Sequence, residues 1–268
     1  MFEQSNERRG YDLKHTNKNI LWKWKMLSLA SVLLLWFILS LIPRTSRSFP
    51  FLNEVLPSIA LMIQRGVLWK DISSSMIAIL IGFALGFVSA IPVAFIMAWY
   101  TPVRNIIEPW IQFIRNIPAL AYVPLIVISA GVGRSSQIIV IWLACFMTMS
   151  ITIYQGIKSI DVTLVKAARV LGANDFDIFR KITVPATTPF IITAIRLGLS
   201  VALTTLIASE STGAIAGMGM RIRSLSNTFE TAPMLMYIIS IGIIGLLFSK
   251  IVDFLERRFT GWQEKIEA

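Results

Sequence analysis

The sequence predicts an all-α integral membrane protein with six transmembrane helices and a helical cytoplasmic loop between the fourth and the fifth. Of the 268 residues, 55% are hydrophobic and only 15% are charged, whereas an ordinary soluble domain carries about 25% charged residues. The mean hydropathy is +0.70. The hydrophobic residues are too many to be buried in one core, because a soluble domain of this length covers much of its surface with polar residues.

The apolar residues also fall into runs of about 20, the length that crosses a bilayer core. Six such runs are present, at approximately residues 25–42, 74–99, 108–130, 136–154, 189–209 and 233–252. The first follows a basic segment, as in a signal peptide, but the small-residue cleavage pattern is missing, so we expect a retained helix.

Between the runs, residues 44–70 are too polar to span a membrane. Their apolar positions predict a short amphipathic helix on the outer surface, formed around Val55, Ile59, Met62 and Ile63. In the third run, Pro118 and Pro124 remove backbone donors, which predicts a bend or break facing protein or a water-filled cavity.

Small residues recur every four positions on two of the predicted spans. They are Ala78, Gly82, Gly86 and Ala90 on the second span, and Ala194, Gly198 and Ala202 on the fifth. Such stripes allow two helix backbones to approach closely, so tight packing between helices is expected there.

The positive charges orient the chain in the membrane. Six spans place both termini and two of the connecting loops on one side of the membrane. That side carries 16 of the 25 Lys and Arg residues, and the loops on the other side carry seven. Cytoplasmic loops carry the excess of Lys and Arg, so both termini are expected in the cytoplasm. The expected layout is a cytoplasmic segment (1–24), the first span with the external amphipathic segment (25–70), a core of five spans (71–255) containing the loop 155–188, and a cytoplasmic tail (256–268).

The net charge of +10 also occurs in nucleic-acid binders, but no fold signature of such a protein accompanies it. We therefore expect membrane lipid and not nucleic acid as a partner. With a single cysteine, Cys145, and a single histidine, the chain has no ligand set for a soft-metal site.

The loop between the fourth and fifth spans predicts two short helices. Asp161 is placed to cap the first helix, and Gly172 to end it in a left-handed conformation. Either Asn174 or Asp175 caps the second helix, and Pro185 is expected to stop it. The first helix carries an apolar face formed by Leu164, Ala167, Ala168 and Leu171, which something must cover.

The run KAARVLGANDFDIFRKITVP, residues 166–185, resembles the cytoplasmic signature of ABC importer permeases, in which Glu-Ala-Ala is followed by Gly and, after nine residues, by Ile-x-Leu-Pro. The matching residues are Ala167, Ala168, Gly172, Ile182 and Pro185. Lys166 replaces the usual Glu and Val184 the usual Leu. By this resemblance, ATPase subunits contact Lys166, Ala167, Ala168, Gly172, Ala173, Asp175, Phe176 and Pro185.

The resemblance extends from about residue 50 to the end of the chain. RNIPALAYVPL at 115–125, then Gly131 and Gly133, then Glu210 with Gly217 and Gly219, is similar to the nitrate, sulfonate, taurine and bicarbonate branch of these permeases. It implies that two copies form the pathway as a homodimer, that two ATPase subunits dock on the loop helices, and that an extracytoplasmic solute-binding protein delivers the solute.

No Gly-Lys pair followed by Ser or Thr occurs in the sequence, so the phosphate cradle of a P-loop is absent. ATP and Mg are therefore expected on the partner ATPase, with no cofactor on this chain and no enzymatic activity. The first loop helix is expected to move as a rigid lever, because a capped helix transmits displacement better than a loop.

The candidate pathway residues are Arg115, Pro118, Tyr122, Pro124, Arg196 and Glu210. Ionisable residues inside a membrane usually face a cavity or a partner. Three alternatives stay open: Arg115 bonds freed carbonyls near Pro118, Arg196 extends to the headgroups, and Glu210 is either a gate or an internal ion partner. Arg115 in the pathway suits an anionic solute, because its guanidinium offers up to five donors.

Other functions need features that the sequence lacks. A lipid-modifying enzyme needs clustered Asp, Glu, His or Lys near an interface, and an ion-coupled secondary transporter needs related halves. The solute itself stays open between a sulfonate, nitrate or related anion and a vitamin precursor of the thiamine-pyrimidine type.

Overall fold

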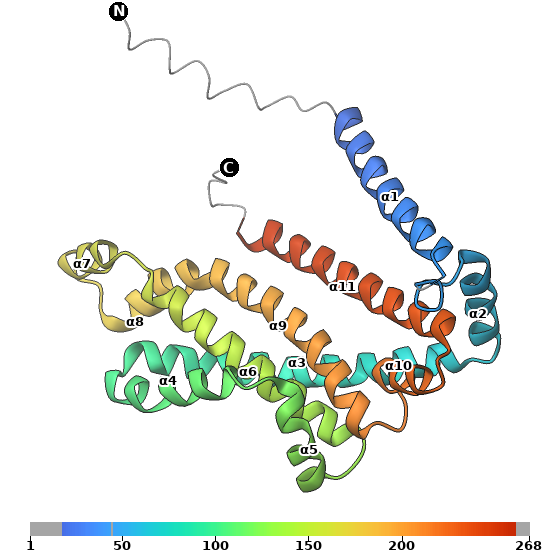
Figure 1. Ribbon diagram of the computed structural model, residues 1–268. Coiled ribbons are helices and arrows are strands. Elements are labelled where there is room, and N and C mark those ends of the chain that lie inside the picture. The colour runs from blue at the N-terminus through green and yellow to red at the C-terminus, as the bar shows by residue number, and fades with distance from the viewer. Residues whose placement is uncertain (1–17, 44, 261–268) are drawn as a thin grey trace, which may run out of the picture. The chain divides into compact units, whose positions relative to one another are not determined.

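The computed structural model describes residues 18–43 and 45–260, and within these ranges the chain is helical without β-strands (Figure 1). The predicted cytoplasmic ends, residues 1–24 and 256–268, fall largely outside the described residues. The chain divides into two compact units, residues 1–57 and 58–268.

The first unit contains α1 (Lys18–Leu41) and the beginning of α2 (Leu52–Gln64). Residues Trp22–Leu41 are long and apolar enough to cross a membrane. The chain after α1 folds back on the last turns of that helix, where the Trp36 indole Nε1 donates to the Pro50 carbonyl at 3.0 Å. The short helix expected within residues 44–70 is confirmed as α2, whereas its place on the outer surface stays a prediction.

The second unit contains the remaining helices, with these bounds: α3 (Val67–Trp99), α4 (Thr101–Arg115), α5 (Ala119–Ala130), α6 (Arg134–Lys158), α7 (Val162–Val170), α8 (Asp175–Ile178), a π-helical segment (Phe179–Thr183), α9 (Val184–Gly213), α10 (Met218–Asn227) and α11 (Thr231–Phe259). Five helices of the described chain are long and apolar enough to span a membrane, and the number is six if the bent pair α4–α5 counts as one span. The all-helical membrane fold is thereby confirmed.

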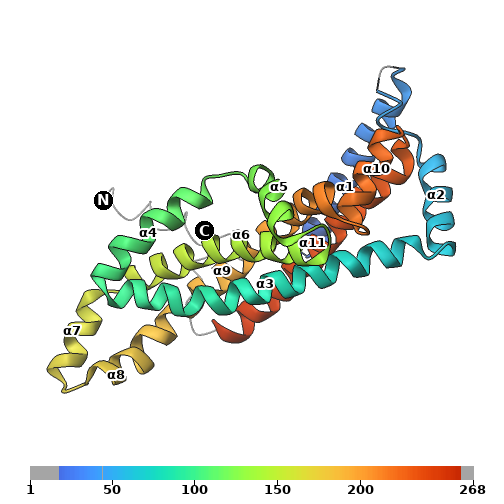
Figure 2. The ribbon, with the colours of Figure 1, turned by 90° about the horizontal axis from the view of Figure 1, so that it is seen from below.

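The centre of this unit is formed by α3, α6 and α9, which run side by side (Figure 2). The small residues of the two predicted stripes are buried along these helices. A Cβ added to Gly82 or Gly86 of α3 would come within 2.8 Å of α6 side chains, and one at Gly198 of α9 within 2.7 Å of the α6 residue Met149. The expected close packing is confirmed, and these interfaces have no room for another methyl group.

The third predicted span, residues 108–130, is broken at Pro118 as predicted, whereas Pro124 lies inside α5 and does not break it. The span consists of α4 and α5, which are bent by 102° at residues 116–118. Pro118 directly precedes α5 with an extended backbone and lacks the N–H that a continuous helix needs. In addition, Arg104, Glu108 and Gln112 recur every four residues, which gives α4 a polar face unsuited to lipid.

Pro185 does not stop the second loop helix as expected. The chain stays helical from Asp175 to Gly213 through the π-helical segment. The Val184 N–H bonds to the Phe179 carbonyl, five residues back, and Pro185 then falls in the first turn of α9. A proline is tolerated there because its missing N–H is not needed.

Candidate functional site

The first loop helix, α7, is capped at both ends as predicted. The Asp161 carboxylate accepts a hydrogen bond from the Thr163 backbone N–H at 2.7 Å, and this bond lowers the pKa of the Asp161 carboxyl. At the other end Gly172 has a φ of 85°. The Gly172 N–H bonds to the Arg169 carbonyl and the Ala173 N–H to the Ala168 carbonyl, each at 3.0 Å, which is a Schellman motif.

The second loop helix continues into α9. The cap that the sequence left open is Asn174, whose side chain accepts from the Asp177 N–H at 2.8 Å. The neighbouring Asp175 pairs with Arg169 at 3.2 Å and thereby joins the two loop helices. Both side chains are well exposed, so this ion pair adds little stability.

No residue of α7 is buried in the described structure. Val162, Val165 and Arg169 line a hollow against α6 and α8. The predicted apolar face lies on the other side of α7 by helical spacing, and its Leu171 is 86% exposed. An exposed apolar face of this kind marks a contact surface for another molecule.

The remaining predicted coupling residues differ in their exposure. Lys166 and Ala167 are exposed, Ala168 and Ala173 are half-buried, and Pro185 is exposed at the start of α9. Among residues 18–43 and 45–260, none forms a hydrogen bond or ion pair with the Lys166 ammonium group.

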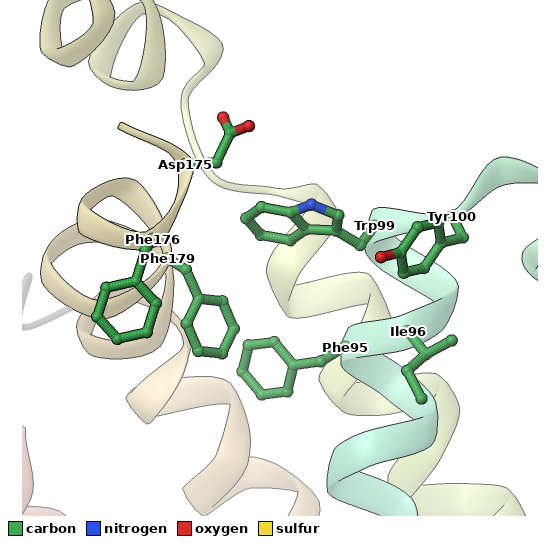
Figure 3. A pocket seen from close by; sticks show the side chains of 7 residues that line it. All are labelled: Phe95, Ile96, Trp99, Tyr100, Asp175, Phe176 and Phe179. Carbon is green, nitrogen blue, oxygen red and sulfur yellow. The ribbon is translucent and has the colours of Figure 1, made fainter. Parts of the chain in front are cut away.

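Phe176 and Asp175 also line an aromatic hollow of about 380 Å³ against the last turn of α3 (Figure 3). The ring of Phe179 packs edge-on against Phe95 and Trp99 of α3, with centroids 5.4 and 5.7 Å apart. These rings attach the loop directly to α3. Phe179 is not among the predicted coupling residues, although the clustering of aromatic residues at the ends of both segments is a usable signal.

A second hollow, of about 350 Å³, lies at the break between α4 and α5. The structure brings three predicted pathway residues together on its wall: Arg115, Pro118 and Tyr122. The fourth, Pro124, lies within α5 and does not line the hollow. The opposite wall belongs to α6 and α9 and includes Thr148, Thr204 and Thr205, which the sequence analysis missed.

Arg196 lies away from this hollow. Its guanidinium Nη2 bonds to the carboxylates of Asp253 at 2.9 Å and Glu256 at 2.8 Å, both on α11. Both carboxylates are about half exposed, so these ion pairs fix the position of α11 beside α9 more than they stabilise the fold.

Glu210 lies at the end of α9, is 1% exposed and does not line the hollow. Its carboxylate accepts from the Ser75 hydroxyl and from the Gly219 N–H, each at 2.7 Å. Gly217 has a φ of 142° and lies so close that a Cβ there would overlap this carboxylate. The similarity noted for Glu210, Gly217 and Gly219 therefore corresponds to a real contact.

The sequence analysis missed Asp71, which is completely buried beside this contact. The Asp71 carboxylate accepts from Arg221 Nε at 2.9 Å, from the Tyr237 hydroxyl at 2.8 Å and from the Gly217 N–H at 3.2 Å. The hydrogen bond and the negative charge of Asp71 raise the pKa of Arg221. We call Asp71, Ser75, Glu210, Arg221 and Tyr237 the buried polar cluster; it joins α3, α9, α10 and α11.

In the part of the chain that the structure describes, no group of three or more His, Cys, Asp or Glu side chains is placed to hold a metal ion.

Comparison with known proteins agrees with this geometry. The family described as binding-protein-dependent transport system inner membrane component matches residues 90–261. A probable ABC transporter permease protein of Brucella abortus (strain 2308) is 41% identical, over 79% of this chain and 85% of that protein. The taurine transport system permease protein TauC of Escherichia coli (strain K12) is 29% identical, over 94% of this chain and 96% of that protein.

The fold also has a solved counterpart. An inward-facing structure of the MetNI methionine ABC transporter aligns with a TM-score of 0.65 and 17% identity, over 72% of this chain and 96% of that chain. Three findings indicate the same family: the capped loop helix with its exposed apolar face, the membrane-spanning helices, and the relative that is 41% identical. The chain therefore belongs to the binding-protein-dependent transport system inner membrane components, the permeases of ABC importers.

Proposed function

We propose that this permease forms, as a homodimer, the membrane pathway for a small anionic solute. In this proposal two ATPase subunits dock on the α7 faces and hold the ATP and Mg, while a solute-binding protein delivers the solute from outside. The single observation that carries the docking is α7 itself, which is capped at both ends and buries none of its residues.

The structure of the loop supports the proposal that α7 moves as a rigid body. The Asp161 cap and the Gly172 turn define both ends of α7, and the nine residues between them form a rod about 14 Å long. Phe179 connects the neighbouring segment to Phe95 and Trp99. A displacement of the loop by an ATPase would thus reach α3 through rings and α9 through continuous helix.

The anionic solute is supported by two observations. The E. coli relative is named for taurine, whose sulfonate is an anion. Arg115 lines the hollow at the α4–α5 break, and no carboxylate of the described residues lines that hollow. The excess of Lys and Arg supports an orientation with α7 and both termini in the cytoplasm.

A larger side chain at position 168 tests whether the ATPase docks on this face of α7. Ala168→Phe should block close approach of the partner backbone, because overpacking a close contact is strongly unfavourable. We expect the purified permease to lose its ATPase subunit and cells with the complete importer to stop taking up taurine, ethanesulfonate and nitrate.

Two variants serve as controls. Ala168→Ser keeps a small side chain at the same position, and Val162→Phe adds the same ring on the opposite side of α7, at a residue that is 61% exposed. Both should retain the ATPase. If Ala168→Phe retained the ATPase and full uptake while the chain reached the membrane in normal amount, the proposed docking face would be wrong.

A further inference from the structure

Four polar side chains converge on the hollow at the α4–α5 break from four different helices. They are Arg115 of α4, Tyr122 of α5, Thr148 of α6 and Thr205 of α9. Among the described residues, none supplies a hydrogen-bond or ion-pair partner to any of these four side chains. Thr205 is only 3% exposed, and its hydroxyl forms no hydrogen bond with another described residue.

This lack of partners is not general among the hydroxyls of α9. Thr204 lines the same hollow, yet its hydroxyl donates to the backbone carbonyls of Val201 at 3.0 Å and Ser200 at 3.3 Å. A helical threonine ordinarily satisfies its hydroxyl in this way. Thr205 and Thr148 do not, so their hydroxyls are available to a ligand.

The charge of the lining determines the sign of that ligand. Of the residues that the structure describes, Arg115 is the single charged one on the wall of the hollow. Arg115 is exposed and has no ion-pair partner among the described residues, and a cation at membrane depth without such a partner favours an anion beside it. The planar guanidinium fits two oxygens of an oxyanion at once, and each of the three hydroxyls can donate one more hydrogen bond.

The size and position of the hollow limit the ligand further. Its volume of about 350 Å³ is at the lower end of the roughly 300–1,000 Å³ found for ligand pockets. Ala144, Met147 and Thr148 lie half-way along α6 (Arg134–Lys158), so the site is near the middle of the membrane span. The rest of the wall is apolar, with Ile114, Ile117 and Val201 among its side chains.

We infer that this hollow binds a single small oxyanion of one negative charge whose other end is uncharged, such as a short alkanesulfonate. The oxygens are held by the Arg115 guanidinium and the hydroxyls of Tyr122, Thr148 and Thr205, and the body of the solute contacts the apolar wall. This inference rests on the proposed function and adds that the permease itself selects its solute.

Because no acidic side chain of the described residues lines this wall, the hollow should distinguish sulfonates that carry an ammonium group from those that do not. Ethanesulfonate and taurine have the same sulfonate and the same two-carbon chain, and taurine carries an additional ammonium group. The hollow has no carboxylate to pair with that ammonium, and moving it out of water without a partner is unfavourable. The site therefore distinguishes the two solutes in favour of ethanesulfonate.

Binding is measured on the purified full-length permease in detergent, as the rise in melting temperature with sodium ethanesulfonate at constant ionic strength. Wild type should give a saturable rise, and taurine should bind at least about tenfold more weakly. Thr205→Val and Arg115→Gln should each weaken ethanesulfonate binding about 10- to 100-fold, the factor for a lost hydrogen bond to a charged group. Thr193→Val is the matched control: its hydroxyl bonds to the Pro189 carbonyl within α9, it does not line the hollow, and the variant should bind as wild type does.

Several outcomes would overturn the inference: no saturable rise in wild type, equal binding of taurine, or wild-type affinity in Thr205→Val. The ligand-free melting temperature of Thr205→Val, expected to equal that of wild type, shows that the variant is folded. Uptake by the assembled importer separates the two claims. If the importer takes up anions while Thr205→Val binds normally, only the inference fails; if it takes up no anion, the proposed function fails.

Discussion

The buried polar cluster makes the replacement of Asp71 by asparagine the most informative test of the fold. Asp71 accepts three hydrogen bonds with two carboxylate oxygens, whereas asparagine has one acceptor oxygen and an NH₂ group. Whichever way the amide is turned, an NH₂ group faces a donor: either the Gly217 N–H or the pair formed by Arg221 and Tyr237. At least one buried donor is then left without an acceptor.

The size of the effect follows from these contacts. Breaking a buried ion pair costs about 3–5 kcal/mol, and the side chain of Arg221 is 30% exposed, so water recovers part of that loss. With one acceptor kept, we expect Asp71→Asn to lower the free energy of unfolding by about 2–3 kcal/mol. For a chain of this size that corresponds to a fall in melting temperature of about 5–10 °C in detergent.

A double-mutant cycle checks the cause of this loss. Tyr237→Phe should cost about 1 kcal/mol in wild type and less after Asp71→Asn, because its hydroxyl can then donate at most to an uncharged amide oxygen. Asp253→Asn removes a carboxylate that is 49% exposed and should cost under about 1 kcal/mol. An unchanged melting temperature in Asp71→Asn, or the same cost of Tyr237→Phe in both backgrounds, would refute the reasoning.

Three further predictions concern the packing, the loop and the orientation. Gly86→Ala places a Cβ 2.8 Å from the Cys145 Cβ and should lower stability by about 1–3 kcal/mol, whereas Gly242→Ala, with nothing within 4 Å, should be neutral or slightly stabilising in the same melting experiment. Removal of the cap by Asp161→Ala should speed amide hydrogen exchange across α7 at neutral pH. Because the pKa of Asp161 is lowered in the folded chain, its stabilising effect is complete above the ordinary aspartate pKa of about 3.9 and is lost as the pH falls through the lowered value; unchanged exchange in the variant would contradict the cap. Cysteines introduced at Leu171 and at Phe229, which are 86% and 87% exposed, should label differently in intact cells: a membrane-impermeant maleimide should modify only the one at position 229. Native Cys145 is fully buried and gives no background, and labelling at position 171 would reverse the proposed orientation.

The long apolar helices and the loop caps were predictable because their signals are local. A run of about 20 apolar residues identifies α3, α6 or α11 whatever lies beside it. Asp161 and Gly172 act on amide groups within a few residues of themselves, so their roles are readable from spacing alone.

The long-range arrangement was not predictable. Asp71 contacts Arg221 and Tyr237 across 150 and 166 residues of sequence. The polar residues before position 74 place the predicted start of the span too late, because α3 begins at Val67. Thr148 and Thr205 look like ordinary helix residues until α6 and α9 are placed against the α4–α5 break. The 102° bend has two causes: Pro118 interrupts the helix, and the polar face of α4 is unsuited to lipid. The angle therefore cannot be predicted from the proline alone.

The π-helical segment at Phe179–Thr183 sets the stiffness of the chain between the loop and the membrane. A helical rod of 39 residues, from Asp175 to Gly213, resists bending along most of its length. The wider turn has poorer hydrogen-bond geometry and is followed by Val184 and then by Pro185, which has no N–H to donate. Under a load on α8 we therefore expect bending mainly in these five residues, whose Phe179 ring contacts the rings of Phe95 and Trp99.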